Sequence, residues 1–149
     1  MSGEGALGAR RVLLAWLPAA LYMGLIWLIS SMEAPQFPTS AFPLRDKGVH
    51  FTEFAVLGFF VAHAALRTWE GRARFRLLAV SVLIAATWGL LDEIHQAFVP
   101  GRSSDVFDVL ADTLGATAGA SARVLLGALF ARSSRPLAAD RALSLEKNE

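Results

Sequence analysis

The sequence contains no cysteine. This absence excludes a disulfide framework and any thiolate metal site. Charged residues make up only 18% of the 149 residues and hydrophobic residues 54%, which is too apolar for an ordinary soluble domain of this length. Lysine is scarce as well, because twelve of the fourteen basic residues are arginine. Together with abundant alanine and glycine, the preference for arginine indicates a GC-rich bacterial genome. Because the chain is also unusually apolar, we expect a protein of the bacterial cell membrane.

Four long segments carry almost no charge. Within 12–29, 49–66 and 77–91 the only ionisable side chains are His50, Glu53 and His63, and a fourth run, 106–130, is interrupted only by Asp108, Asp112 and Arg123. A helix of about 20 residues crosses the bilayer core. We therefore predict an all-α, polytopic bundle of four transmembrane helices, at about 12–31, 49–66, 75–97 and 105–130. They form one domain over 1–132, followed by a flexible cytoplasmic tail over 133–149.

The basic residues orient this bundle. Arginine pairs or clusters precede the first helix, fill the connection between the second and third, and follow the fourth, whereas the opposite side holds only Arg45, Lys47 and Arg102. The positive-inside rule then places both termini in the cytoplasm. The loops 32–48 and 97–104 are predicted to face outward. Because the basic residues flank helices and form no single patch, we expect no nucleic-acid partner.

Polar side chains gather at the predicted outer ends of three helices. On the second helix, Asp46, His50 and Glu53 recur with Leu57 at spacings of four, three and four, so they share one face. A carboxylate as deep as Glu53 is costly in lipid, by roughly 2.5–3.5 kcal/mol, so we expect it to face protein or water.

The third helix carries a comparable stripe, which continues into a turn. Trp88, Asp92, His95, Gln96 and Val99 lie on one broad face, with Glu93 about a quarter-turn away. The Pro100–Gly101 pair that follows suits the central positions of a type II turn.

The fourth helix begins with an acidic seam that becomes a small-residue seam. Ser104 or Asp105 suits its N-cap, and the seam consists of Asp105, Asp108, Asp112, Gly115 and Gly119. The two glycines suit close helix packing, either within one chain or in a homo-oligomer. Two structural interpretations stay open: Asp105 and Asp108 serve only as helix caps, or Glu53 and Asp112 belong to a buried network with Arg102, Lys47 or a histidine.

Two segments resemble the signature regions of the VanZ-like membrane proteins. They are DKGVHFTEFAVLG (46–58) and LLDEIHQAFVPGRSSDVFDVLADTLGATAG (90–119). The order DK-x-x-H-F, DE-x-x-Q, PGR and D-x-x-D-x-x-x-x-x-x-G is kept with its spacing. The resemblance covers the second to fourth helices and implies that the functional positions are Asp46, Lys47, His50, Asp92, Glu93, Gln96, Arg102, Asp105, Asp108 and Gly115. Glu53, His95 and Asp112 rest on helical geometry alone.

The resemblance also implies a role in the cell envelope. The name-giving member of the family is an accessory protein of glycopeptide-resistance clusters, associated with low-level resistance to teicoplanin, and the family has no settled biochemical mechanism. Most relatives lie outside such clusters, so drug resistance does not follow for this chain.

Three functions fit the outer polar residues. The first is binding of a membrane lipid headgroup, a lipid-linked cell-wall precursor or a glycopeptide-type antibiotic: carboxylates and Gln96 suit hydroxyls and amines, whereas Arg102, Lys47 and the start of the fourth helix suit a phosphate. The second is a membrane-embedded hydrolase or transferase acting on an envelope lipid, with His50 or His95 as base. Acids such as Asp92, Glu93, Asp105 or Asp108 would activate water or hold a divalent cation, for which Mg²⁺ or Mn²⁺ fits better than zinc. The sequence permits such an ion but does not require it. Transport ranks third, because the acids stop at Asp112.

Overall fold

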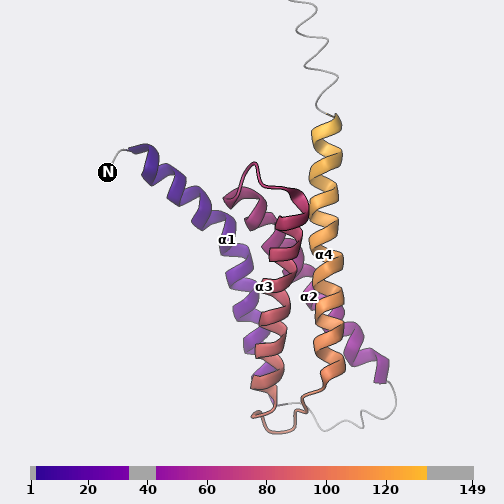
Figure 1. Ribbon diagram of the computed structural model, residues 1–149. Helices are drawn as coiled ribbons and strands as arrows, with labels where there is room; N and C mark the ends of the chain where they lie inside the picture. The colour runs from indigo at the N-terminus through magenta and orange to yellow at the C-terminus, as the bar shows by residue number, and fades with distance from the viewer. Residues whose placement is uncertain (1–2, 34–42, 134–149) are drawn as a thin grey trace, which may run out of the picture.

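The computed structural model describes residues 3–33 and 43–133 of the chain, which form four helices. They are α1 (Gly3–Ser30), α2 (Pro43–Thr68), α3 (Arg74–Gln96) and α4 (Val106–Ser133). Neighbouring helices in the sequence run in opposite directions, so the α1 C-terminus, the α3 C-terminus and the starts of α2 and α4 meet at one end of the bundle (Figure 1). All four helices are long and apolar enough to cross a membrane. The predicted all-α bundle is therefore confirmed.

The helices extend beyond their apolar runs. α2 begins at Pro43, so residues 43–48 are helical, and the prediction that they belong to a loop was wrong. Proline suits the first turn of a helix because its missing N–H would have no partner there. Bilayer thickness limits the apolar stretch of a helix but not its polar ends, which explains why hydropathy placed the start of α2 too late. The rest of the predicted outer loop, 34–42, lies outside the described residues, as does the predicted tail after Ser133.

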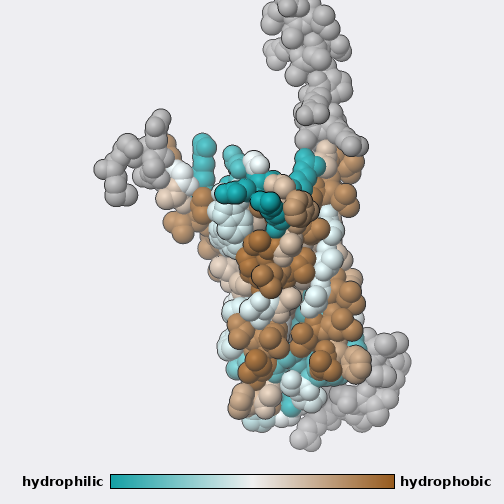
Figure 2. Space-filling model, viewed as in Figure 1, coloured by the Kyte–Doolittle hydropathy of each residue, from teal (hydrophilic) through white to brown (hydrophobic). Residues whose placement is uncertain are grey.

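The surface of the bundle is apolar around most of its circumference. Leucine, isoleucine, valine and phenylalanine side chains are exposed on all four helices, and Figure 2 shows them covering the middle of the molecule. A soluble monomer does not expose so much contiguous apolar surface, whereas lipid covers it in a membrane. At the end where the α3 C-terminus lies, a hydrophilic patch is visible between these side chains. This multi-pass membrane protein therefore keeps polar groups inside the bundle at one end.

The core is centred on α2. Phe54, Leu57 and Val61 are fully buried there, together with small residues of the neighbouring helices. α1 packs on α2 through aromatic contacts, including Tyr22 against Phe60, and through a hydrogen bond from Trp16 Nε1 to Thr68 Oγ1 at 2.8 Å. α1 bends away from the bundle toward its N-terminus (Figure 1), and Pro18, which interrupts helical hydrogen bonding, lies inside it.

Glycines bring α2 and α4 into close contact. A Cβ atom built on Gly115 would lie 2.1 Å from the Phe51 carbonyl oxygen, and one built on Gly119 would lie 1.7 Å from the Ala55 carbonyl oxygen. Both positions therefore require glycine as long as α4 keeps this distance from α2. The glycine face of α4 is covered by α2 of the same chain.

Candidate functional site

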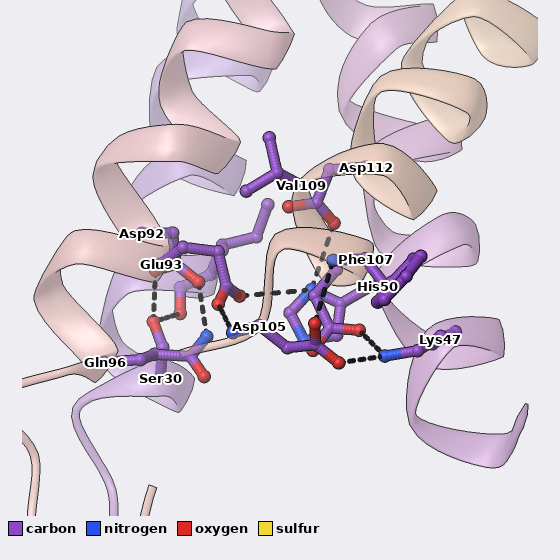
Figure 3. A network of polar contacts seen from close by, with 12 residues as sticks. Ser30, Lys47, His50, Asp92, Glu93, Gln96, Asp105, Phe107, Val109 and Asp112 are labelled. Carbon is purple, nitrogen blue, oxygen red and sulfur yellow. Dashed lines mark hydrogen bonds and ion pairs between the residues drawn. The ribbon is translucent and has the colours of Figure 1, made fainter. Parts of the chain in front are cut away.

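Side chains from all four helices meet at one end of the bundle, and Figure 3 shows them directed toward one another. We call this group the polar cluster. It consists of Ser30, Lys47, His50, Asp92, Glu93, Gln96, Asp105, Asp108 and Asp112. Seven of these nine residues are buried, the exceptions being Lys47 and Asp105. The cluster therefore lies inside the protein and reaches the surface at one edge.

The first part of the cluster joins α3 to α1. Gln96 Nε2 donates to Asp92 Oδ2 at 2.8 Å, which is the i, i+4 contact expected from the stripe on α3. The Ser30 hydroxyl donates to Asp92 Oδ1 and also contacts the Ile26 carbonyl oxygen at 2.8 Å. Ser30 was missed by the sequence interpretation, which found no diagnostic residue in the first helix. The available signal was a Ser30–Ser31 pair that ends an otherwise apolar run.

The central part contains His50, Glu93 and Asp112, which come from α2, α3 and α4. His50 Nδ1 lies 3.0 Å from Asp112 Oδ1 and 3.8 Å from Glu93 Oε1. The three side chains are 8%, 3% and 0% exposed. Glu93, expected a quarter-turn away from the polar stripe, is thus at the centre of the cluster. α4 packs on that flank of α3, so a carboxylate placed there points into the protein.

The third part connects the start of α4 to α2 and to α3. Lys47 Nζ lies 2.7 Å from Asp105 Oδ2 and 2.9 Å from Asp108 Oδ1. Asp105 also caps α4 as predicted, because its Oδ1 accepts the Phe107 N–H at 2.9 Å. The hydrogen bond from Lys47, followed by the bond from the Phe107 N–H, lowers the pKa of Asp105 below its ordinary value. In addition, the Asp105 N–H donates to Glu93 Oε2 at 3.0 Å, which links the edge of the cluster to its centre.

A tight turn between α3 and α4 places Asp105 beside Glu93. The Arg102 N–H donates to the Val99 carbonyl oxygen at 3.1 Å, and Gly101 has φ = +78° at the third position of the turn. This combination defines the predicted type II turn, in which that position favours glycine. The chain therefore reverses within four residues, and α4 starts beside the end of α3.

Two predicted site residues, His95 and Arg102, face α1 and lie outside the polar cluster. His95 stacks on Trp27 with ring centroids 4.1 Å apart, and its Nε2 lies 2.9 Å from Ser31 Oγ. Arg102 donates to the Ile29 and Met32 carbonyl oxygens at 3.1 and 3.3 Å, so it binds the C-terminal end of α1 and the turn that follows it. On α3, Asp92 and His95 thus contact α1, whereas Glu93 contacts the start of α4.

The remaining predicted residues, Asp46 and Glu53, border the cluster. Asp46 is exposed, and one of its carboxylate oxygens lies within 4.8 Å of ligand atoms of His50 and Asp108. Glu53 is half-buried, one turn beyond His50, and forms no hydrogen bond with a described member of the cluster. Away from this end, His63 accepts a hydrogen bond from Arg123 Nε at 3.1 Å, so it joins α2 to α4 as well as packing there.

We expect the hydrogen bond between Ser30 and Asp92 to hold the C-terminal end of α1 against α3. The Ser30→Ala substitution should lower the free energy of unfolding by about 1–3 kcal/mol, because it leaves a buried carboxylate oxygen without this donor. Ser81→Ala is the matched control, since the buried Ser81 hydroxyl bonds only the Leu77 carbonyl oxygen of its own helix. Reversible unfolding in mixed micelles measures both losses. Equal losses for the two variants would mean that Ser30 does not anchor α1.

Comparison with models of known protein families gave a match that covers most of the bundle. A family model described as VanZ/LLP1 matches residues 13–127, a range that includes every member of the polar cluster. Neither a curated protein nor a solved structure was found to match the chain.

Proposed function

This chain belongs to the VanZ/LLP1 family, and from that membership and the polar cluster we propose that it acts in the bacterial cell envelope by binding a polar headgroup. The headgroup belongs to a membrane lipid or a lipid-linked cell-wall precursor. The observation that carries the proposal is the open edge of the cluster, where Lys47 and Asp105 are 30% and 39% exposed and Asp46 is exposed beside them. These residues stand at the ends of membrane-spanning helices, which is the depth of lipid headgroups.

The hydrogen bonds favour hydroxyl and amine groups over phosphate. Arg102 is engaged with two backbone carbonyls at and just after the end of α1, Lys47 is paired with two carboxylates, and the start of α4 is capped by Asp105. The cations and helix dipole that would suit a phosphate therefore already have partners. Carboxylates dominate the open edge, and they accept hydrogen bonds from sugar hydroxyls and ammonium groups.

The arginine distribution predicts which side of the membrane the polar cluster faces. If both termini are cytoplasmic, as that distribution predicts, the polar cluster faces outward. A glycopeptide-type antibiotic arriving from outside presents the same sugar hydroxyls and amines, so a teicoplanin-resistance-like role would use the same edge.

The test is the set of lipids that the protein retains. Native mass spectrometry should detect lipids with glycosylated or amine-bearing headgroups on the wild-type protein and at least a tenfold lower occupancy on an Asp46→Asn/Asp105→Asn variant. Asparagine still caps helices, so α4 should remain folded. Glu70→Gln, an exposed acid in the α2–α3 connection at the other end of the bundle, is the control. If both variants retain the same lipids as the wild type, the proposed headgroup site is wrong.

One observation favours a catalytic alternative, a membrane-embedded hydrolase or transferase acting on an envelope lipid. His50 is hydrogen-bonded to the buried Asp112, and Asp46 and Asp108 approach it within 4.8 Å from the cluster edge. An imidazole oriented by a buried carboxylate is a common general base. Catalysis would appear as release of a headgroup by the wild-type protein and not by the His50→Gln variant.

A further inference from the structure

The centre of the polar cluster has the donor set of a metal site. His50, Glu93 and Asp112 each offer one ligand atom, and these atoms lie within 4.8 Å of one another. The three residues come from three helices and are buried. Their position is therefore held by the packing of the bundle and not by one flexible segment.

Two oxygen atoms in this group accept no hydrogen bond from any described residue. Glu93 Oε1 and Asp112 Oδ2 are buried and form no hydrogen bond with any described residue. Buried carboxylate oxygens are almost always hydrogen-bonded or bound to a cation, because a buried charge without compensation is strongly unfavourable. The other oxygens of these two side chains are bound, Glu93 Oε2 by the Asp105 N–H and Asp112 Oδ1 by His50. Glu93 Oε1 and Asp112 Oδ2 can therefore each still accept a hydrogen bond or bind a cation.

The charges of the described residues point to a cation. Asp92, Glu93, Asp108 and Asp112 are buried acids, whereas the only lysine among the cluster members, Lys47, is already paired with Asp105 and Asp108. Lys47 is therefore engaged away from Glu93 and Asp112, and His50 is the one basic member of the cluster that lies against these two acids. We propose that a divalent metal ion binds between His50, Glu93 and Asp112.

The distances agree with this assignment. Two ligand atoms that are each about 2.1 Å from one ion lie roughly 3–4 Å apart. His50 Nδ1 lies 3.0 Å from the nearer Asp112 oxygen and 3.8 Å from Glu93 Oε1. The site also has supporting contacts: the Asp105 N–H orients Glu93, and the lack of a side chain at Gly89 leaves space for Asp112, since a Cβ there would lie 2.7 Å from Asp112 Oδ2.

The ligand types select the class of metal. Imidazole suits Zn²⁺, Fe²⁺ and their neighbours, and carboxylates suit Mn²⁺ and Mg²⁺. One nitrogen with two carboxylates therefore favours Mn²⁺ or Zn²⁺ over Ca²⁺, which prefers oxygen ligands only. This set differs from the acids first considered for a cation, because Asp112 replaces Asp92, Asp105 and Asp108. The inference uses the same cluster as the proposed function but does not require a headgroup.

The experiment uses metal alone. Purified full-length protein in detergent is stripped with a chelator and titrated with Mn²⁺ or Zn²⁺, without added lipid, by calorimetry and elemental analysis. We expect one ion per chain, and at least 100-fold weaker binding by Asp112→Asn and Glu93→Gln. Glu70→Gln, an exposed acid at the other end of the bundle, should bind as the wild type does.

Two further measurements keep the result interpretable. Far-ultraviolet circular dichroism checks that the variants remain helical. Pulsed electron paramagnetic resonance of the Mn²⁺-loaded wild type should show coupling to a histidine nitrogen, which needs no variant. Absence of stoichiometric binding, or loss of binding in Asp46→Asn and not in Asp112→Asn, would overturn the site. Lipid retention by the metal-free protein is scored separately, so failure of the metal site and failure of headgroup binding are distinguishable.

Discussion

The Gly119→Ala substitution is expected to destabilise the bundle, even though alanine favours helices more than glycine does. The added methyl group would lie 1.7 Å from the Ala55 carbonyl oxygen, which is a backbone atom of α2 and cannot move aside as a flexible side chain could. α2 and α4 would have to separate. Overpacking of this kind costs about 1–3 kcal/mol and more when backbone must move, so we expect a loss on the order of 3 kcal/mol in the free energy of unfolding.

Gly24→Ala in α1 is the matched control. No heavy atom lies within 4 Å of a Cβ built on Gly24. The same chemical change should therefore be neutral or stabilising by up to about 1 kcal/mol, because alanine has the higher helix propensity. Reversible unfolding of both variants in mixed micelles gives the comparison. Effects of the same sign and size would show that the close α2–α4 contact is absent in the membrane.

The second large effect is expected from His50→Leu. His50 provides the hydrogen bond to Asp112 Oδ1 and is the nearest titratable nitrogen to Glu93. Breaking a buried pair by removing one partner typically costs about 3–5 kcal/mol, because the other charge stays buried without compensation. We expect a loss of that order. The loss in the free energy of unfolding arises mainly because the Asp112 and Glu93 carboxylates stay buried without the imidazole. The lost hydrogen bond itself contributes less.

A double-mutant cycle isolates this cause. In the His50→Leu/Asp112→Leu protein the orphaned Asp112 carboxylate is gone, so much of the lost stability should return, although Glu93 remains. His95→Leu is the control, because the hydrogen bond of His95 to Ser31 is exposed, and its loss should be clearly smaller. If the double variant is as unstable as the sum of the two single variants, His50 and Asp112 are not coupled, and the central pair does not support the fold.

Local features of the chain were predictable from short patterns. The type II turn follows from Pro100 and Gly101, because the allowed φ values of these two residues match its central positions. The cap was narrowed to Ser104 or Asp105, because an acceptor directly before an apolar helical run suits that position, and the structure assigns it to Asp105. Such features depend only on residues that are adjacent in the sequence. They form without a tertiary contact.

The membership of the polar cluster was only partly predictable. Helical periodicity places Asp92, His95 and Gln96 on one face of α3, yet the structure turns Asp92 and Gln96 inward and packs His95 against Trp27 of α1. Ser30 had no periodic partner within its own helix, so nothing local identified it as a contact of Asp92.

The sequence by itself determined four membrane-spanning helices, the acidic end of the bundle and the glycine seam of α4, because hydropathy, charge and spacing are properties of each segment alone. Only the tertiary structure decided that Glu93 is central, that His95 and Arg102 turn to α1, and that two buried oxygens accept no hydrogen bond from the described residues. The physical reason is that periodicity states which residues share a face of one helix, but not how that helix is rotated about its own axis relative to its neighbours. The packing of neighbouring helices sets which part of that face each neighbour meets.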